Sequence, residues 1–433
     1  MMKTHSPWLY IPSLYFLEGL PYILINVVSG ALYTKMGVPN DVFVFWTGFL
    51  YLPWTLKMFW SPLVDGYSTK RRWLLWGQFL AAAIFAFVVF SLGWDSFFLA
   101  SLLGFAVGAF VSATCDIATD GYYMLSLSPE QQGYFVGIRT IFYRLAMIFG
   151  GGTLLMLIGT WESKTESIVL AWKMGFLLIA ALFVLLGIYH CWLLPRPAED
   201  RPAGSFSGEK SAFKEAFKTY FSQKNIFYIL LFILFYRLGD ALLEKIITPF
   251  LIGPTQSGAL GLSTQQLGFI KGTLGLGAII AGNLAGGWLL GRYGFKKCIW
   301  PFATILILPN FFYAYMAWAK PSLTVIAALI ALEHLGNGLA MMAFSIFIMY
   351  VSQGPYKTSH YAISTGIMAL GMMIPSMLSG KIQVALGYEA FFIVSAVFSL
   401  VTLAIVPLTF KIKSIEETEK LFRRHKAQIG DVD

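Results

Sequence analysis

The sequence predicts an all-α membrane protein of twelve transmembrane helices, arranged as two six-helix halves related by pseudo-two-fold symmetry. Three observations predict this fold class. Of the 433 residues, only 12% are charged and 57% are hydrophobic, whereas soluble domains carry roughly a quarter charged residues. Apolar runs of about 20 residues, the length that crosses a bilayer as a helix, recur along the chain. One long polar stretch, residues 194–225, divides these runs into six and six.

The twelve expected spans follow one another with mostly short polar connections. They cover residues 8–33, 42–62, 73–93, 96–124, 134–159, 167–194, 225–252, 265–290, 298–318, 322–350, 358–380 and 388–410. The expected parts are an N-terminal half at 1–194, a cytoplasmic linker at 195–224, a C-terminal half at 225–411 and a cytoplasmic tail at 412–433. In the linker, "EKSAFKEAFKTYF" has apolar residues at helical spacing and is expected to lie along the membrane surface. A long loop between six-helix halves is typical of two-half transporters.

The basic residues lie mostly on one side of this topology. With both termini in the cytoplasm, the cytoplasmic segments collect 20 Lys and Arg and the opposite side collects five. This bias follows the positive-inside rule. The net charge of +9 therefore reports orientation and does not indicate a nucleic-acid partner. The first apolar segment shows no small-residue cleavage site, so we expect it to be retained as a helix.

Two loops at equivalent places carry a weak internal repeat. "SPLVDGYSTKRR" (61–72) follows the second span and "GWLLGRYGFKK" (287–297) follows the eighth. Both fit a degenerate G-x-x-x-D-R-x-G-x-R-R pattern, which resembles the loop motif of major facilitator transporters. An acid at a helix end beside basic residues can latch two helix ends together, although the basic residues could instead only fix topology. The candidate gating residues are Asp65, Lys70, Arg71, Arg72 and Arg292.

Setting the charges assigned to loops aside leaves a short list of ionisable residues inside the expected spans. They are Glu18, Lys57, Asp116, Asp120, Arg139, Arg144, Arg237, Asp240, Glu244, Lys245, Lys271, Glu333 and His334. A charge at the bilayer centre costs about 3 kcal/mol or more on insertion scales. We therefore expect these side chains to face an interior cavity and to be largely paired.

Several of the acids are spaced to share a helical face. Residues four apart lie on one face of a helix. Such pairs are Asp116 with Asp120, Asp240 with Glu244, and Glu333 with Asn337. The acids concentrate in spans 1, 4, 7 and 10, which are equivalent positions in a structure made of three-helix repeats and which line the central cavity of such transporters. This pattern favours a polar transport route.

Two roles are open for these acids. Burial favours the protonated carboxyl group, which could then carry a proton through a transport cycle. A neighbouring arginine instead holds the acid as a structural ion pair. Arg139 and Arg144 are the expected partners of the acids in span 4, and Arg237 that of Asp240. In span 1, Gly19 and Pro21 follow Glu18 and loosen the helix, which could free backbone groups for substrate or only kink the helix.

A family resemblance rests on stretches spread over nearly the whole chain. They are "TLKMFWSPLVDGY", "SATCDIATDGYYM", "YRLAMIFGGG", "YRLGDALLEKIITPFL", "LGFIKGTLGLGAIIAGNLAGGWLLGRYG", "ALEHLGNGLAMMAF" and "SHYAISTGIMALGMMIPSMLSG". The sequence resembles the AmpG-type muropeptide permeases, which with the acetyl-CoA transporters form one branch of the major facilitator superfamily. The resemblance implies an inner-membrane symporter, driven by the proton gradient, that imports cell-wall-derived amino-sugar compounds.

The span 4 motif departs from this family's pattern. The family reads like D-I-x-x-D-A-Y-R, and the sequence has Gly121 in place of Ala and Tyr123 where a basic residue is usual. The lost basic group suggests a less anionic ligand. Aromatic residues here could stack on sugar rings, or they could serve only in packing. The candidate substrate-binding residues are Glu18, Tyr122, Tyr123, Tyr143, Lys271, Glu333 and Asn337.

Other classes of function find less support in the sequence. No nucleophile–base set, metal spacing or phosphate loop appears, so we expect no enzyme and no cofactor. The expected partners are a small-molecule substrate, a proton as coupling ion and the lipid bilayer, with the protein a monomer. Two rivals stay open: import of a neutral N-acetylated amino sugar or short saccharide, and a membrane sensor that binds a cell-wall fragment without moving it.

Overall fold

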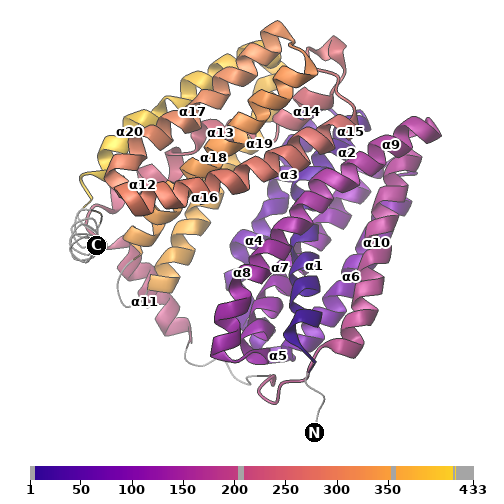
Figure 1. Ribbon diagram of the computed structural model, residues 1–433, viewed down its shortest axis with the longest axis vertical. Helices are drawn as coiled ribbons and strands as arrows, with labels where there is room; N and C mark the ends of the chain where they lie inside the picture. The colour runs from indigo at the N-terminus through magenta and orange to yellow at the C-terminus, as the bar shows by residue number, and fades with distance from the viewer. Residues whose placement is uncertain (1–4, 203–208, 353–356, 413–414, 416–433) are drawn as a thin grey trace. The chain divides into compact units, whose positions relative to one another are not determined.

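The computed structural model describes residues 5–202, 209–352, 357–412 and 415, and every regular element in these residues is helical (Figure 1). The chain divides into two compact units. Unit 1 comprises Met1–Phe206, Leu251–Gly253 and Gly261–Thr273, and unit 2 comprises Ser207–Phe250, Pro254–Leu260 and Leu274–Asp433. The expected tail lies outside the described residues apart from Ile412 and Ile415.

Unit 1 contains the first ten α-helices of the chain and the shorter turns between them. Its elements are η1 (Pro7–Leu9), α1 (Ile11–Ile23), η2 (Leu24–Val28), α2 (Ser29–Lys35), α3 (Asn40–Gly48), η3 (Phe49–Tyr51), α4 (Leu52–Leu56), η4 (Lys57–Phe59), α5 (Ser61–Tyr67), α6 (Lys70–Ser91), α7 (Phe97–Ser126), α8 (Pro129–Ile148), η5 (Phe149–Leu154), α9 (Leu155–Thr165), α10 (Ile168–Leu193) and, later in the chain, α15 (Thr264–Leu267).

The elements from α11 onward belong to unit 2, apart from α15, residues 268–273 of η7 and residues 251–252 of α14, which belong to unit 1. They are α11 (Glu209–Phe221), α12 (Ile226–Phe235), α13 (Leu238–Leu243), α14 (Ile247–Ile252), η6 (Thr255–Ser257), η7 (Gly268–Gly275), α16 (Leu276–Tyr293), α17 (Phe295–Ala319), α18 (Leu323–Val351), α19 (Lys357–Ser399) and α20 (Val401–Thr409). The linker helix α11 packs on α19 through Tyr220, whose hydroxyl lies 2.9 Å from the hydroxyl of Ser364.

The twelve expected spans are confirmed. By length and composition, eleven helical stretches of the described residues can cross a bilayer, and the last of these runs over Ser359–Thr409. That stretch of 51 residues is not one straight helix, because Gly387 has the non-helical angles φ 75° and ψ 169°. Its two sides correspond to the eleventh and twelfth expected spans.

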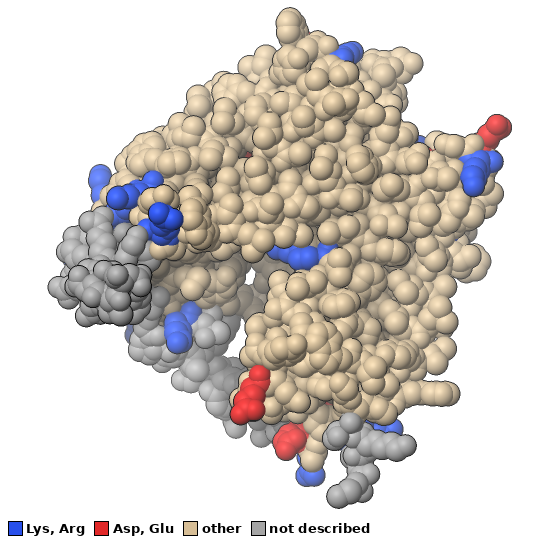
Figure 2. All heavy atoms as spheres, viewed as in Figure 1, with Lys and Arg blue, Asp and Glu red and all other residues tan. Residues whose placement is uncertain are grey.

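The outer surface of the helices is apolar, as a bilayer requires. Large apolar side chains such as Trp192 and Leu284 are exposed, and most of the face in Figure 2 carries neither acid nor base. Basic side chains gather on that face at the end of unit 2 where Figure 1 labels α12 and α20. Exposed apolar surface on this scale marks contact with lipid, so the chain is a multi-pass membrane protein.

The close approach of α1 to α8 depends on a glycine. A Cβ atom on Gly19 would lie 2.8 Å from the carbonyl oxygen of Tyr143 and 3.0 Å from the Cβ of Ala146. Two residues further on, Pro21 lies inside α1, and the π-helical turn η2 follows from Leu24. Proline has no N–H to donate within the helix. The glycine therefore serves packing, and the proline marks where regular α-helix gives way.

This contact predicts a selective loss of stability. Gly19→Ala should lower the free energy of unfolding by about 1–3 kcal/mol, because overpacking forces backbone to move. Gly30→Ala is the matched control, since the nearest atom to its Cβ would be 3.9 Å away and alanine favours the helix over glycine. Denaturant unfolding of the purified proteins in detergent measures both. Equal stability of Gly19→Ala and the unchanged protein would contradict the packing argument.

In unit 2, the seventh span is interrupted in mid-course. The helix α12 ends at Phe235 and α13 begins at Leu238, with Arg237 at a non-helical φ of −112° and ψ of 25°. The carbonyl oxygen of Tyr236 accepts a hydrogen bond from the Thr402 hydroxyl at 3.0 Å. Because a backbone group freed inside a membrane must find a partner, this bond allows the break, and the break places Arg237.

Candidate functional site

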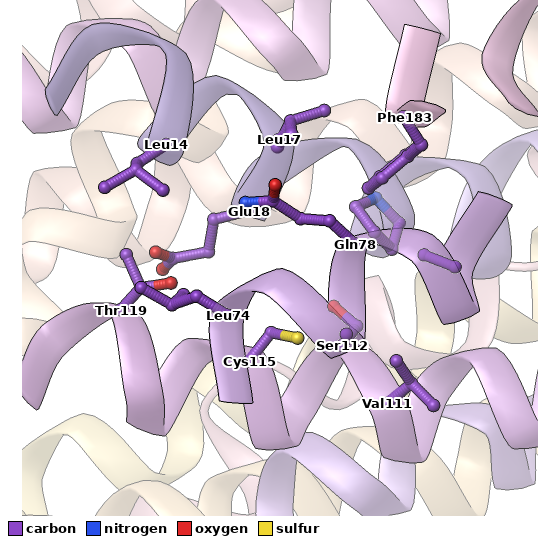
Figure 3. A pocket seen from close by; sticks show the side chains of 13 residues that line it. Leu14, Leu17, Glu18, Leu74, Gln78, Val111, Ser112, Cys115, Thr119 and Phe183 are labelled. Carbon is purple, nitrogen blue, oxygen red and sulfur yellow. The ribbon is translucent and has the colours of Figure 1, made fainter. Parts of the chain in front are cut away.

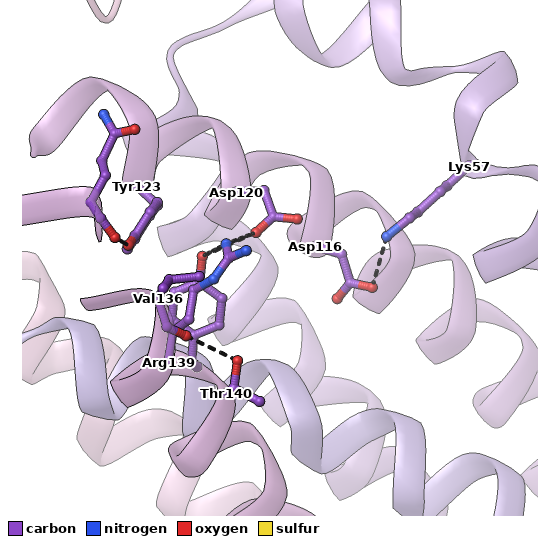
Figure 4. A network of polar contacts seen from close by, with 9 residues as sticks. Lys57, Asp116, Asp120, Tyr123, Val136, Arg139 and Thr140 are labelled. Carbon is purple, nitrogen blue, oxygen red and sulfur yellow. Dashed lines mark hydrogen bonds and ion pairs between the residues drawn. The ribbon is translucent and has the colours of Figure 1, made fainter. Parts of the chain in front are cut away.

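Two ion pairs are arranged along one face of α7 in unit 1 (Figure 4). The Asp116 carboxylate lies 3.3 Å from the ammonium of Lys57, and the Asp120 carboxylate lies 2.9 Å from the guanidinium of Arg139. The acids are one turn apart on α7, whereas Lys57 comes from η4 and Arg139 from α8. Three separate segments of unit 1 thus supply the charges.

The two pairs differ in their contact with solvent. The side chain of Asp116 is 11% exposed and that of Asp120 is 50% exposed. An exposed ion pair contributes about 0–1 kcal/mol to stability, whereas removing one partner of a buried pair costs about 3–5 kcal/mol. We therefore expect the loss of its cationic partner to cost more stability for Asp116 than for Asp120. The second carboxylate oxygen of Asp116, Oδ1, is buried without a hydrogen-bond partner among the described residues.

Aromatic rings hold Arg139 in place. Its guanidinium donates to the Tyr15 hydroxyl at 2.9 Å, and that hydroxyl donates to Asp120 at 3.0 Å. The guanidinium also lies over the rings of Tyr15 and Tyr123, at 5.3 and 4.8 Å from their centroids. The Tyr123 hydroxyl donates to the carbonyl oxygen of Gln132. The ring of Tyr123 therefore supports the cation and its hydroxyl is already used.

Lys57 and Tyr15 were not among the predicted site residues. The sequence did show Lys57 as an ionisable residue inside a span, which is the signal that could have identified it. Arg144, which we expected near the acids of α7, instead donates to the Sδ of Met147 at 3.7 Å. Tyr143, the residue before it, lies within electrostatic reach of Asp116 and Glu18.

Glu18 of α1 lines a small pocket inside unit 1 (Figure 3). The pocket has a volume of about 20 Å³, and its polar lining residues include Glu18, Gln78, Ser112 and Thr119. Figure 3 shows the Glu18 side chain extending from α1 toward Thr119 of α7. The Oε2 atom of Glu18 and the hydroxyl of Ser112 are buried, and neither has a hydrogen-bond partner among the described residues. Most of the other lining residues are apolar, so these two groups are the pocket's unused hydrogen-bonding capacity.

The next turn of α7 serves packing. Tyr122 is fully buried and donates to the carbonyl oxygen of Pro195 at 2.8 Å. A Cβ on Gly121 would lie 2.9 Å from the Cε of Lys70, so the departure from alanine at this position makes room for the lysine side chain. For Tyr122 the structure favours the packing alternative over sugar stacking.

The loop before α6 ties helix ends together within unit 1. Arg71 donates to the carbonyl oxygens of Leu194 and Cys191, at 3.1 and 2.7 Å, near the end of α10. Asp200, which the sequence did not single out, accepts the backbone N–H groups of Lys70 and Arg71 at 2.6 and 3.0 Å. A carboxylate at a helix N-terminus and a cation at a C-terminus are both favourable.

The remaining gating candidates have other positions. Arg72 is exposed on α6, and the side chain of Asp65 lies outside the described residues. Arg292 is exposed at the end of α16, with its guanidinium 5.4 Å from the ring centroid of Trp288. Whether these residues gate transport stays a prediction.

Unit 2 has a polar centre of its own at the break in the seventh span. The Nε and one terminal nitrogen of Arg237 both donate to Asp240 at 3.2 Å, and the same terminal nitrogen is 3.4 Å from the amide oxygen of Asn337. The side chains of Arg237 and Asp240 are 18% and 12% exposed. Glu244, four residues beyond Asp240, is exposed and lies outside this centre.

A second group on α18 lies deeper in unit 2. The Glu333 carboxylate accepts from the Tyr313 hydroxyl at 3.2 Å and lies 2.5 Å from Nδ1 of His334. That ring nitrogen is also 3.0 Å from the carbonyl oxygen of Ile330. Glu333 is buried, so these contacts occupy it. Lys271, by contrast, lies half-buried in the part of η7 that belongs to unit 1.

The arrangement places paired charges and hydrogen-bonding groups inside membrane-spanning helices. It consists of ion pairs, buried acids and hydrogen-bonding aromatic groups on helices long enough to span a membrane. Among the described residues, no group of three or more His, Cys, Asp and Glu could hold a metal ion. The chemistry that such a set supports is recognition of a polar ligand and exchange of protons.

Comparisons with known proteins agree with this interpretation. The sequence profile of the Major Facilitator Superfamily matches residues 13–243 and 238–429. The chain is 29% identical over 389 residues to the anhydromuropeptide permease of Escherichia coli strain K12, which covers 88% of this chain and 75% of that protein. It is 24% identical to putative transporter AmpG 4 of Rickettsia conorii, covering 90% of this chain and 93% of that one.

A solved structure shows the same fold. The chain matches a bacterial homologue of the human lysosomal transporter Spinster with a TM-score of 0.66 and 16% sequence identity. The match covers 96% of this chain and 98% of the other. At this level of identity the likeness supports the fold and leaves the ligand open.

Proposed function

Because the chain belongs to the major facilitator superfamily, and is therefore a transporter and not an enzyme, we propose that it imports cell-wall-derived anhydromuropeptides by proton symport. The acid–base cluster on α7 is the observation that carries the coupling proposal. Carboxyl groups inside membrane spans are costly and mark ion or proton pathways. The substrate class rests on the similarity to the anhydromuropeptide permease, which extends over most of both chains.

The broken helices support a ligand site at the level of the charged residues. In unit 1, Pro21 and the turn η2 interrupt the first span, and in unit 2 the break at Arg237 interrupts the seventh. These spans hold the same position in the two halves. Interrupted helices at corresponding positions are the best sequence-level pointer to a transporter's binding site, although η5 and η7 also depart from α-helix in other spans.

The proposed mechanism is alternating access. A muropeptide carries carboxylates on its peptide and hydroxyl and amide groups on its sugars, so it can compete with Asp116 and Asp120 of unit 1 for their cationic partners. When these pairs loosen and an acid is protonated, the site could switch from opening outward to opening toward the cytoplasm. Release of the proton to the cytoplasm would restore the pairs. The bias of basic residues supports an orientation with both termini in the cytoplasm, in the inner membrane, and we propose a monomer.

A second substrate class has one observation in its favour. Tyr123 occupies the position where the permease family has a basic residue, and Lys57 and Arg139 already have acidic partners. This arrangement suits a neutral N-acetylated amino sugar or a short saccharide. The muropeptide remains the first proposal, because Arg139 lies over the Tyr123 ring and supplies positive charge at that place.

Competition for uptake distinguishes these proposals. Membrane vesicles that contain the protein should accumulate a labelled anhydro-N-acetylmuramyl peptide, and excess unlabelled muropeptide should block uptake more strongly than excess N-acetylglucosamine. Stronger inhibition by the simple sugar would refute the muropeptide proposal and support the neutral substrate. Binding to sealed vesicles without accumulation would refute transport of this substrate and favour a sensor.

A further inference from the structure

In the cluster around Glu18, the acids outnumber the cations. Three carboxyl groups, those of Glu18, Asp116 and Asp120, act on one another electrostatically, and the cations within reach of Glu18 are Lys57 and Arg139. Each of these cations already pairs directly with an aspartate. With all three acids ionised, the cluster would carry an excess negative charge inside a membrane-spanning bundle.

Of the three acids, Glu18 is the one without a direct ion pair to Lys57 or Arg139. Glu18 as a whole is half-buried, but its Oε2 atom is fully buried and has no hydrogen-bond partner among the described residues. A buried carboxylate without a direct partner is costly, by several kcal/mol, and a protein relieves this cost by protonation. With Glu18 protonated, the two ion pairs remain and the cluster becomes electrically neutral.

A water molecule in the pocket beside Glu18 could accept the hydrogen bond that a protonated Glu18 donates. A pocket of about 20 Å³ has room for a water molecule, provided that polar groups line it. Ser112, a residue that is 4% exposed, lines the same pocket, and its hydroxyl has no hydrogen-bond partner in the part of the chain that the structure describes. Gln78 also lines it, and its amide oxygen lies 2.9 Å from Nδ1 of the buried His190.

We propose that Glu18 is the group that binds and releases the coupling proton, with a water molecule in the adjoining pocket bridging it to Ser112. This inference rests on the proton coupling of the proposed function and reassigns Glu18 from the substrate-binding set. The step is a simple proton exchange: the Glu18 O–H bond breaks, the proton leaves through water, and the carboxylate stays. With Glu18 protonated, Asp116 keeps its ion pair with Lys57 and Asp120 keeps its ion pair with Arg139.

The electrostatic surroundings of Glu18 come from several elements. The groups that face it are Asp116, Asp120 and Cys115 of α7, Lys57 of η4, Arg139 and Tyr143 of α8, and Tyr15 of α1 itself. When the Glu18 proton leaves, the new negative charge lies beside both cations and competes with the aspartates for them. Deprotonation of Glu18 therefore weakens the two ion pairs. Through these ion pairs, proton release would affect substrate binding.

Infrared spectroscopy tests the proposal without any substrate. The purified protein in detergent should show the C=O stretch of a protonated carboxylic acid at neutral pH, shifted in D₂O, and part of this band should disappear in Glu18→Gln. Glu166→Gln, an exposed glutamate in the same unit, is the matched control and should leave the band unchanged. An identical band in Glu18→Gln and the unchanged protein, or no such band at all, would overturn the proposal.

A transport assay separates this inference from the proposed function. Glutamine resembles the protonated acid in shape, so Glu18→Gln should still exchange labelled for unlabelled muropeptide across the membrane while losing accumulation driven by a proton gradient. Gradient-driven accumulation by Glu18→Gln would overturn the assignment. If the unchanged protein does not transport muropeptide, the substrate proposal fails, and the infrared result still decides the protonation of Glu18.

Discussion

Replacing Lys57 with Met is expected to abolish gradient-driven uptake and to lower the free energy of unfolding by about 1–3 kcal/mol. The loss arises because Asp116, whose side chain is 11% exposed, would keep its charge without a partner. Removing one member of a buried pair costs about 3–5 kcal/mol, and the smaller figure reflects the 35% exposure of the Lys57 side chain. Asp116 would then compete with Glu18 for the proton, which would uncouple transport.

The double variant Lys57→Met/Asp116→Asn makes this prediction specific. It removes both charges, so most of the lost stability and a large part of the uptake should return. Unfolding in detergent and uptake into vesicles would be measured on the two single variants and the double variant together. A double variant that is no more stable than Lys57→Met alone would show that the two residues do not act as a pair.

Arg237→Met is expected to have the larger effect on stability, about 3–5 kcal/mol. Both Arg237 and Asp240 are largely buried, and the guanidinium holds Asp240 through two nitrogens and also contacts Asn337. Without it, a carboxylate remains unpaired at a helix break inside the membrane. The apparent unfolding temperature in detergent, taken at one fixed scan rate, should fall well below that of the unchanged protein.

Two further variants define what Arg237 contributes. Arg237→Met/Asp240→Asn should recover most of the stability, because no unpaired charge is left. Glu244→Gln is the control, since Glu244 is an exposed acid one turn away, and it should be as stable as the unchanged protein. If Arg237→Met unfolds at the same temperature as Glu244→Gln, the pair does not stabilise the break.

Hydropathy was sufficient to predict the spans, because a lipid-exposed helix must satisfy its backbone internally and present apolar side chains. The ends of the helices were predicted less well. The fifth span was expected at 134–159, whereas the helical stretch runs over Pro129–Thr165. Hydropathy falls at the water boundary although the helix continues, here from a capping box formed by Ser128 and Gln131.

Pairing was predictable only where sequence spacing determines it. Arg237 and Asp240 are three residues apart, so the sequence places them near one another. Lys57 and Asp116 are 59 residues apart, and their contact depends on how η4 packs against α7. No pattern within a single helix contains that information, which is why we expected Arg144 in the place that Lys57 holds.

Contacts distinguish residues that the sequence could not. Tyr122 and Tyr123 are adjacent and both buried, yet Tyr122 donates to the carbonyl oxygen of Pro195 while the ring of Tyr123 lies beneath Arg139. Asp200 gave no signal at all, because an aspartate in a polar linker is ordinary until the fold brings it to the start of α6. Such roles follow from tertiary contacts between distant segments.

Uptake of labelled anhydro-N-acetylmuramyl peptide into proteoliposomes of the purified protein tests the central claim most directly. The substrate would be offered with an imposed proton gradient, with no gradient, and with a sodium gradient in its place. The account predicts accumulation above the external concentration with the proton gradient alone, and its loss in Glu18→Gln. Accumulation that needs no proton gradient, or that follows sodium, would contradict it.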